Sequence, residues 1–119
     1  MRLLVVDDSK VMRNKIERSV TAHRVDVVGH ASNGREAIIM FRQLKPDLVT
    51  LDITMPEMDG LETLDILLSD NPDARVLIIS ALADKATAIE ALVRGALGFL
   101  CKPFDDMELN NALRELAED

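Results

Sequence analysis

The chain has 119 residues, a net charge of −7 at pH 7 and a hydrophobic fraction of 48%. This length suits one domain with a buried core, and the negative charge argues against binding of a nucleic-acid backbone. No apolar run approaches the roughly 18 residues of a membrane-spanning helix, and no signal-peptide region opens the chain. Cys101 is the single cysteine and cannot form an internal disulfide, so we expect a cytoplasmic protein that contacts neither membrane nor nucleic acid.

Strand and helix patterns alternate from the beginning of the chain. The apolar run Leu3–Val6 predicts a first strand, and apolar residues then recur one helical turn apart from about Lys10 to His23. Ser9 stands before this helix as a candidate N-cap. Val25–Ala31 predicts a second strand, and because Asp26 interrupts its apolar run, we expect this strand at a sheet edge.

Three further strands are predicted by short apolar runs at Leu48–Leu51, Val76–Ile79 and Phe99–Cys101. Four further helices are predicted by apolar stripes that should face the core: Ala37, Phe41 and Leu44; Leu61, Leu64 and Leu68; Ala86, Ile89 and Val93; Leu109, Leu113 and Leu116. Pro46 must end the second helix, and Gly95 suits the C-terminal cap of the fourth, expected over about Asp84 to Arg94. Asp105 or Asp106 starts the last helix.

Five strands joined by helices predict an α/β fold with a parallel, doubly wound sheet and five helices. The second and fifth strands have the least continuous apolar character and belong at the edges, which the strand order 2-1-3-4-5 satisfies. Winding then reverses between the first and third strands, and ligands bind outside the carboxyl ends of the strands at such a point. These elements use up residues 1–119, so we expect one domain and no separate output domain.

Reactive side chains follow the carboxyl ends of four predicted strands: Asp7 and Asp8, Asp52, Ser80, and Lys102. Three carboxylates and one ammonium give this edge a charge of about −2, which a divalent cation would balance. Asp52 ends the predicted central strand and is the natural acceptor of a phosphoryl group, whereas the pair Asp7-Asp8 is better suited to holding Mg²⁺. Ser80 could hydrogen-bond a phosphoryl oxygen, and Lys102 could neutralise one.

Four motifs resemble the receiver domain of two-component response regulators, particularly the single-domain chemotaxis type, in their usual order and over the whole chain. They are Leu4–Ser9 (LVVDDS), Asp52–Gly60 (DITMPEMDG), Ser80–Ala81 and Lys102–Phe104 (KPF). The resemblance implies a flavodoxin-like fold. Chemotaxis receivers themselves exemplify the strand order given above, so the resemblance adds no independent support for that order.

The resemblance implies that Asp52 accepts a phosphoryl group from a histidine kinase, a phosphotransfer protein or a small donor such as acetyl phosphate. It implies that Asp8, Asp52 and the backbone carbonyl of Thr54 ligate Mg²⁺, with Asp7 acting through a bound water. Thr54 and Leu82 match positions that tune the lifetime of the phosphoryl group. Such a protein is not an enzyme toward other substrates, although it phosphorylates itself and slowly dephosphorylates itself.

The resemblance also implies a switch formed by Ser80 and Phe99. On phosphorylation the hydroxyl moves toward the phosphoryl group and the ring turns inward, which reshapes the face formed by the fourth helix, the fifth strand and the fifth helix. A downstream protein target would bind that face. Lys102 would contact the phosphoryl group, and Pro103 matches a position that follows a cis peptide bond. Without the family, Phe99 would be interpreted as part of the core.

Two other functions stay open. A Mg²⁺-dependent phosphohydrolase could use Asp52 as a covalent nucleophile, but enzymes that resemble haloacid dehalogenases carry a second aspartate two positions later, where this chain has Thr54. A pseudo-receiver could bind partners without phosphorylation, but such proteins usually lack an acidic residue or the lysine, and this chain has them all. His23 and His30 fall away from the predicted site and have no metal-ligand spacing.

Overall fold

The computed structural model describes residues 1–22, 24–53, 60–81 and 85–118. Five strands form one sheet: β1 (Arg2–Val6), β2 (Asp26–Ala31), β3 (Leu48–Asp52), β4 (Arg75–Ala81) and β5 (Gly98–Lys102). Every neighbouring pair is parallel, and the order is β2-β1-β3-β4-β5. The predicted α/β fold and strand order are confirmed, with β2 and β5 at the edges.

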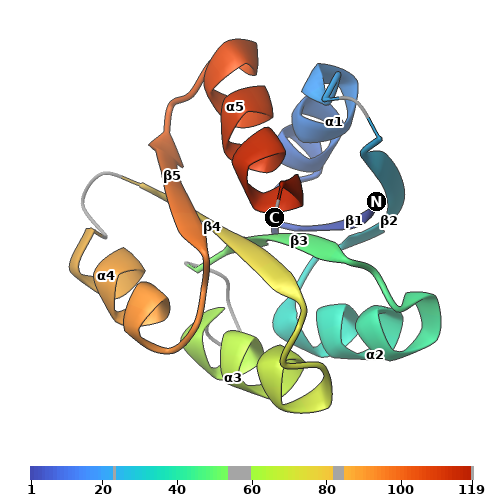
Figure 1. The fold of residues 1–119 in the computed structure, drawn as a ribbon, viewed down its shortest axis with the longest axis vertical. Coiled ribbons are helices and arrows are strands. Elements are labelled where there is room, and N and C mark those ends of the chain that lie inside the picture. The colour runs from blue at the N-terminus through green and yellow to red at the C-terminus, as the bar shows by residue number, and fades with distance from the viewer. Residues whose placement is uncertain (23, 54–59, 82–84, 119) are drawn as a thin grey trace.

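Helices cover both faces of this sheet (Figure 1). On one face lie α1 (Lys10–Ser19) and α5 (Asp106–Ala117), and on the other lie α2 (Gly34–Leu44), α3 (Gly60–Asp70) and α4 (Lys85–Val93). We call these the α1/α5 face and the α2–α4 face. Strand side chains alternate between them. No helix in the described residues is long and apolar enough to cross a membrane.

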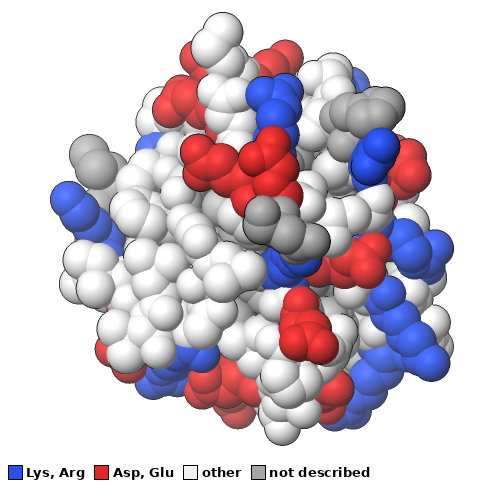
Figure 2. Space-filling model, viewed as in Figure 1, with Lys and Arg blue, Asp and Glu red and all other residues white. Residues whose placement is uncertain are grey.

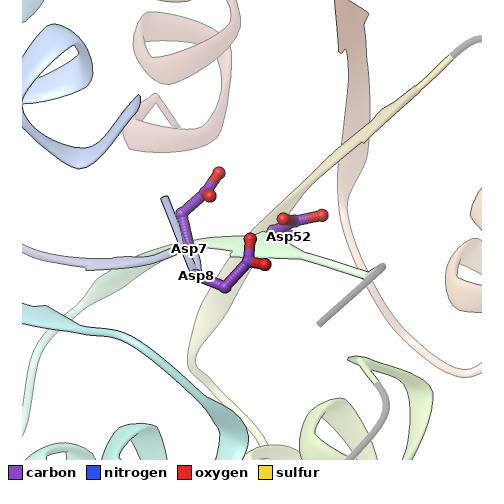
Figure 3. A group of neighbouring side chains, drawn as sticks. All are labelled: Asp7, Asp8 and Asp52. Atoms are coloured by element: carbon purple, nitrogen blue, oxygen red, sulfur yellow. The ribbon is translucent and has the colours of Figure 1, made fainter. Parts of the chain in front are cut away.

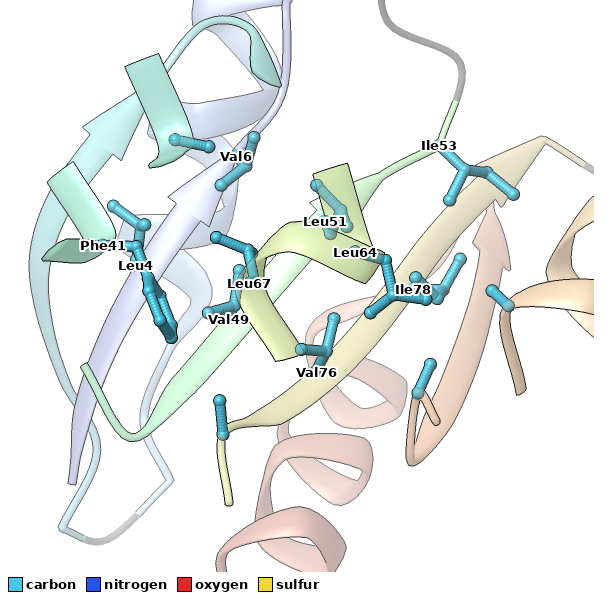
Figure 4. Packing of buried hydrophobic residues seen from close by; sticks show 14 of the residues in the cluster. Leu4, Val6, Phe41, Val49, Leu51, Ile53, Leu64, Leu67, Val76 and Ile78 are labelled. Atoms are coloured by element: carbon cyan, nitrogen blue, oxygen red, sulfur yellow. The ribbon is translucent and has the colours of Figure 1, made fainter. Parts of the chain in front are cut away.

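A hydrophobic cluster fills the space on each face of the sheet. On the α2–α4 face, Phe41 of α2 and Leu64 and Leu67 of α3 pack against the strands, as Figure 4 shows. On the α1/α5 face, Ile16 of α1 and Leu109 of α5 pack against the same strands. Strands β1, β3 and β4 are buried on both sides, which explains why their sequences are continuous apolar runs.

Side-chain caps define where several helices begin. The side chain of Ser9 caps α1, as predicted, and the side chain of Asn33 caps α2. Asp105, rather than Asp106, caps α5, and the third residue of that helix returns a hydrogen bond to complete a capping box. Gly95 follows α4 with a φ of 120°, a conformation that favours glycine at a helix C-terminus.

Helix α1 is shorter than the sequence predicts. It ends at Ser19 instead of continuing to His23, which lies outside the described residues. The side chain of Asn110 in α5 explains this end, because its Nδ2 donates to the Ser19 carbonyl at 2.7 Å. Its Oδ1 accepts from the backbone amides of Thr21 and Ala22 at 2.7 and 2.8 Å. A buried amide from another helix thus supplies partners that a further helical turn would otherwise supply.

The predicted inward stripe of α4 is wrong. Ala86, Ile89 and Val93 are all exposed, Ile89 by 49% and Val93 by 77%. The helix instead buries Ala88 and Ala91 completely against the sheet. Small side chains at a contact shorten the distance between packed elements, so the alanine side of α4 can lie close to the strands. The larger aliphatic side chains consequently face outward, and Figure 2 shows a broad uncharged area over α4 and β5.

Candidate functional site

Strand alternation determines which reactive side chains share a face of the sheet. Asp7 continues the alternation of β1 onto the α1/α5 face, and Asp52 and Lys102 end β3 and β5 on that same face. Ser80 near the end of β4 points to the opposite, α2–α4 face, which it shares with Phe99 of β5. Asp7, Asp52 and Lys102 therefore form one group, and Ser80 and Phe99 form another on the far side of the sheet.

The three acids lie together at the carboxyl edge of the sheet. One carboxylate oxygen from each of Asp7, Asp8 and Asp52 lies within 4.8 Å of the others, and Figure 3 shows the Asp8 carboxylate pointing toward Asp52. Asp7 and Asp52 are only 1% exposed, whereas Asp8 is exposed. The Lys102 ammonium lies 3.2 Å from an oxygen of Asp7 and 3.5 Å from an oxygen of Asp52.

Burial raises the pKa of Asp7 above its usual value. The backbone amide of Ser9 donates to the Asp7 carboxylate at 2.9 Å and lowers this pKa, while the charge of Asp52 raises it and Lys102 lowers it. The direction is upward because removing a carboxylate from water and placing it beside a second one both disfavour its charged form. The protein thus holds negative charge at a place where a bound cation would relieve repulsion.

The donor set fits a hard divalent cation. It consists of carboxylate oxygens from two buried side chains and one exposed side chain, so a cation could be held from one side and keep waters on the other. Mg²⁺ prefers oxygen ligands and usually retains several waters. Thr54, whose carbonyl is the further ligand implied by the family resemblance, lies outside the described residues.

Ser80 is fully buried, and its Oγ has no hydrogen-bond partner among the described residues. A buried hydroxyl without a partner costs about 1–3 kcal/mol. Phe99 is partly buried and packs against the hydrophobic cluster of the α2–α4 face. Leu82, which follows Ser80 by two positions, lies outside the described residues. The peptide bond between Lys102 and Pro103 is cis, as the resemblance implies.

Sequence reasoning missed two contacts made by α1 near this edge. Arg13 lies outside the apolar stripe of α1, yet its Nη1 donates to the backbone carbonyl of Asp7 at 2.7 Å. Lys15 donates to the carbonyl of Phe104 at 3.2 Å and lies over its ring at 4.8 Å from the centroid. A helical wheel gives only the direction of a side chain, and long cationic side chains can bend back over the helix N-terminus.

Residues 3–114 match the response regulator receiver domain family, and the chain belongs to this family. The chemotaxis protein CheY of Thermotoga maritima is 39% identical over 117 residues, which cover 98% of each chain. CheY of Listeria monocytogenes is 42% identical over 118 residues, or 99% of each chain. The chain is therefore a receiver of two-component signalling, and it is of the chemotaxis type.

A solved complex gives the structural comparison. The CheX–CheY–BeF₃–Mg²⁺ complex of Borrelia burgdorferi matches with a TM-score of 0.92 and 31% identity, over 100% of this chain and 90% of that one. Receivers also occur inside longer relatives: a protein-glutamate methylesterase/protein-glutamine glutaminase of Archaeoglobus fulgidus is 42% identical, but the match spans 34% of its length. Receivers of the CheY kind receive signals and are not enzymes toward other substrates.

Proposed function

We propose that the protein accepts a phosphoryl group on Asp52 in a Mg²⁺-dependent reaction and thereby changes its affinity for a target protein. One observation carries this proposal: the Asp52 carboxylate is buried at the carboxyl end of the sheet, with two further carboxylates within 4.8 Å and an ammonium at 3.5 Å. This combination suits a nucleophile that must receive a dianionic group without losing its position.

In the proposed transfer, an oxygen of Asp52 attacks the phosphorus of a phosphohistidine on a kinase or phosphotransfer protein. The P–N bond breaks, its electron pair stays on the imidazole nitrogen, and an acyl phosphate forms. With acetyl phosphate the P–O bond breaks and acetate leaves. Lys102, already 3.5 Å from Asp52, would neutralise one phosphoryl oxygen.

We assign the three acids different roles at the Mg²⁺ site according to their exposure and their existing hydrogen bonds. Asp8 and Asp52 are the proposed direct ligands of Mg²⁺, together with the carbonyl of Thr54. Asp7 already accepts from Ser9 and from Lys102, which suits a role through a bound water. Bound Mg²⁺ would offset charge among the acids and on the incoming phosphoryl group.

The switch would work through the opposite face of the sheet. A phosphoryl group brings new acceptor oxygens, and the Ser80 hydroxyl is a donor without a hydrogen-bond partner in the described structure. Phe99 shares its face, beneath α4, so a movement of Ser80 can be followed by the ring and by the surface of α4, β5 and α5. That Ile89 and Val93 are exposed on α4 supports this surface as the one that a target contacts.

The CheY relatives support these partner and cofactor assignments. The Borrelia protein was solved bound to CheX with BeF₃ and Mg²⁺, and beryllofluoride serves as a stable phosphoryl mimic. The contact of Lys15 with Phe104 joins α1 to the segment after β5, the surface that we assign to the kinase or phosphotransfer protein.

The decisive experiment is incubation with acetyl phosphate and Mg²⁺, followed by intact-mass measurement of the wild type and of Asp52→Asn. We expect a single lasting phosphoryl adduct in the wild type and none in the variant. An undiminished adduct in Asp52→Asn would move the acceptor elsewhere, turnover of varied phosphate esters would indicate a phosphohydrolase, and no wild-type adduct would indicate a pseudo-receiver.

The switch is tested separately by NMR with beryllofluoride. Ser80→Ala should still accept a phosphoryl group, because the hydroxyl is not part of the acid cluster. Its spectral response across residues 83–104 should be much smaller than that of the wild type. An unchanged distal response in this variant would contradict the proposed coupling and leave Phe99 as ordinary core.

A further inference from the structure

Arg13 makes a contact that the proposed function does not use. It lies in the first turns of α1, is half-buried, and donates from Nη1 to the backbone carbonyl of Asp7 at 2.7 Å. Its Nε is buried and has no hydrogen-bond partner among the described residues. An arginine that leaves one donor unsatisfied in a buried position is held there by its other contacts, of which the carbonyl bond is one.

With the bond from Arg13, the amide, the carboxylate and the carbonyl of Asp7 are all hydrogen-bonded. The amide of Asp7 donates to the carbonyl of Ala31 at 3.0 Å, and its two carboxylate oxygens accept from Ser9 at 2.9 Å and Lys102 at 3.2 Å. Its carbonyl, held by Arg13, belongs to the planar peptide group that joins it to the next residue. Fixing that plane therefore fixes the direction in which residue 8 leaves the strand.

Asp8 depends on its backbone for its position. Its side chain is exposed and makes no hydrogen bond to another described residue, in contrast to the carboxylate of Asp7. Nevertheless it contributes an oxygen to the acid cluster. An exposed, unbonded carboxylate samples several rotamers, so its availability as a metal ligand depends on how firmly its backbone is oriented.

We propose that Arg13 is a positioning residue for the Mg²⁺ site: its bond to the Asp7 carbonyl orients the Asp7–Asp8 peptide and so holds the Asp8 carboxylate beside Asp52. This inference rests on the proposed function, because it takes the acid cluster as the Mg²⁺ site. Outer partners that orient metal ligands typically change metal affinity by about tenfold or more when they are removed.

A purely electrostatic role for Arg13 makes the opposite prediction. A guanidinium near the acids repels a divalent cation, so removing its charge would strengthen Mg²⁺ binding. The Arg13 charge does affect nearby carboxylates. The pKa of Glu36 is lowered chiefly by hydrogen bonds from Ser32, with a smaller contribution from Arg13. The sign of the change in Mg²⁺ affinity therefore distinguishes positioning from simple charge.

The experiment measures the Mg²⁺ dissociation constant of the metal-free full chain by calorimetric titration. We compare the wild type with Arg13→Met, which removes the donor, and with Arg13→Lys, which keeps a charge and a donor. The control is Arg18→Met, which removes the same charge from an exposed position on the same helix. We expect about tenfold weaker binding in Arg13→Met, nearly wild-type binding in Arg13→Lys, and no weakening in the control.

Three results would overturn the inference: tighter binding in Arg13→Met, equal weakening in Arg18→Met, or a lower melting temperature of Arg13→Met with an unchanged dissociation constant. If Arg13→Met does not fold, Arg13→Gln replaces it, because the shorter glutamine side chain also loses the bond to the Asp7 carbonyl. Unchanged Mg²⁺ affinity in Arg13→Gln would contradict the inference in the same way. A wild-type protein that binds no Mg²⁺ would instead contradict the proposed function, and the inference would fall with it.

Discussion

At the scale of single residues, Asp7 links the charge of the site to folding. Its raised pKa means that the folded chain binds a proton at this carboxyl more tightly than the unfolded chain, whose ordinary value is 3.8. The Asp7 contribution to stability is therefore greatest in acid and is lost as the pH rises from 3.8 through the raised folded pKa. The charged form of Asp7, which the proposed Mg²⁺ site requires, therefore carries a cost in stability.

We expect Asp7→Asn to raise the free energy of unfolding of the metal-free protein at neutral pH, with the gain disappearing toward acid pH. The measurement is urea unfolding in EDTA across that pH range. Asp26→Asn, at an exposed position at the start of β2, is the control and should not reproduce the pH-dependent gain. A gain that is constant with pH would show that titration of Asp7 is not its origin.

Thr50 offers a second residue-scale prediction. It is fully buried in β3, and its hydroxyl has no hydrogen-bond partner among the described residues. Thr50→Val removes the unpaired hydroxyl and keeps the branched shape, so we expect a gain of about 1 kcal/mol in unfolding free energy. Thr63, which is equally buried but does not lack a partner, is the matched control, and Thr63→Val should be destabilising. Equal effects at the two sites would contradict the argument.

At the scale of elements, α1 and α5 are joined by one buried side chain. The Asn110 amide binds the carbonyl of Ser19 and the amides of Thr21 and Ala22, and it also donates to the carbonyl of Asp106. The Ser19 carbonyl lies at the C-terminal end of α1, where carbonyls lack intrahelical partners, and Thr21 and Ala22 lie just beyond that end. The position of α1, and with it the reach of Arg13 and Lys15 toward the site edge, depends on this contact.

Asn110→Ala should lower the free energy of unfolding by about 3 kcal/mol, because it leaves several backbone groups without partners. Chemical denaturation measures the loss. The neighbouring Asn111→Ala is the control: Asn111 is exposed and its side chain accepts from Arg114, so its removal should change stability by less than about 0.5 kcal/mol. Similar losses in both variants would mean that Asn110 does not bind the two helices together.

The strands were easier to predict from the sequence than the rotations and ends of the helices. β1, β3 and β4 are buried on both sides, so their apolar runs are unambiguous, and the residues that follow β1 and β3 had to meet at one edge. The end of α1 depends on Asn110, which lies far along the chain. The inward face of α4 depends on close packing of Ala88 and Ala91, which a pattern weighted toward large apolar residues misses.

The candidate site also has parts that the sequence predicts and parts that only the structure reveals. Grouping Asp7, Asp8, Asp52 and Lys102 follows from the strand ends alone. Arg13 could not be found by that reasoning, because it donates to a backbone carbonyl. Every residue has such a carbonyl, so the sequence does not indicate which one accepts a side-chain hydrogen bond. Ser80 can be assigned to a strand end, but that its hydroxyl lacks a hydrogen-bond partner is visible only once its neighbours are in place.

At the scale of the whole molecule, we expect Mg²⁺ to act as a stabilising ligand, because the site that we propose for it exists only where folding gathers the three acids. At a free concentration of about 100 times its dissociation constant, a ligand specific to the folded state contributes about 2.7 kcal/mol. Thermal unfolding with and without Mg²⁺ measures this. Asp8→Ala should remove most of the effect, and its metal-free baseline must be compared separately, since losing one acid reduces repulsion.

The control for this prediction is Asp26→Ala, which removes one exposed negative charge at the opposite end of the sheet. It should keep the full Mg²⁺ response. If the wild type did not respond to millimolar Mg²⁺, or if Asp8→Ala responded as strongly as the wild type, the acid cluster would not be the Mg²⁺ site.

The alternation of side chains along the strands has an evolutionary consequence. Asp7, Asp52 and Lys102 lie on one side of the sheet, and Ser80, Phe99 and α4 lie on the other. If a target binds the outer surface of α4, as we propose, substitutions that adapt this surface to a new target leave Asp7, Asp52 and Lys102 in place. A duplicated gene could therefore acquire a new target protein while it keeps the residues of the proposed phosphoryl transfer.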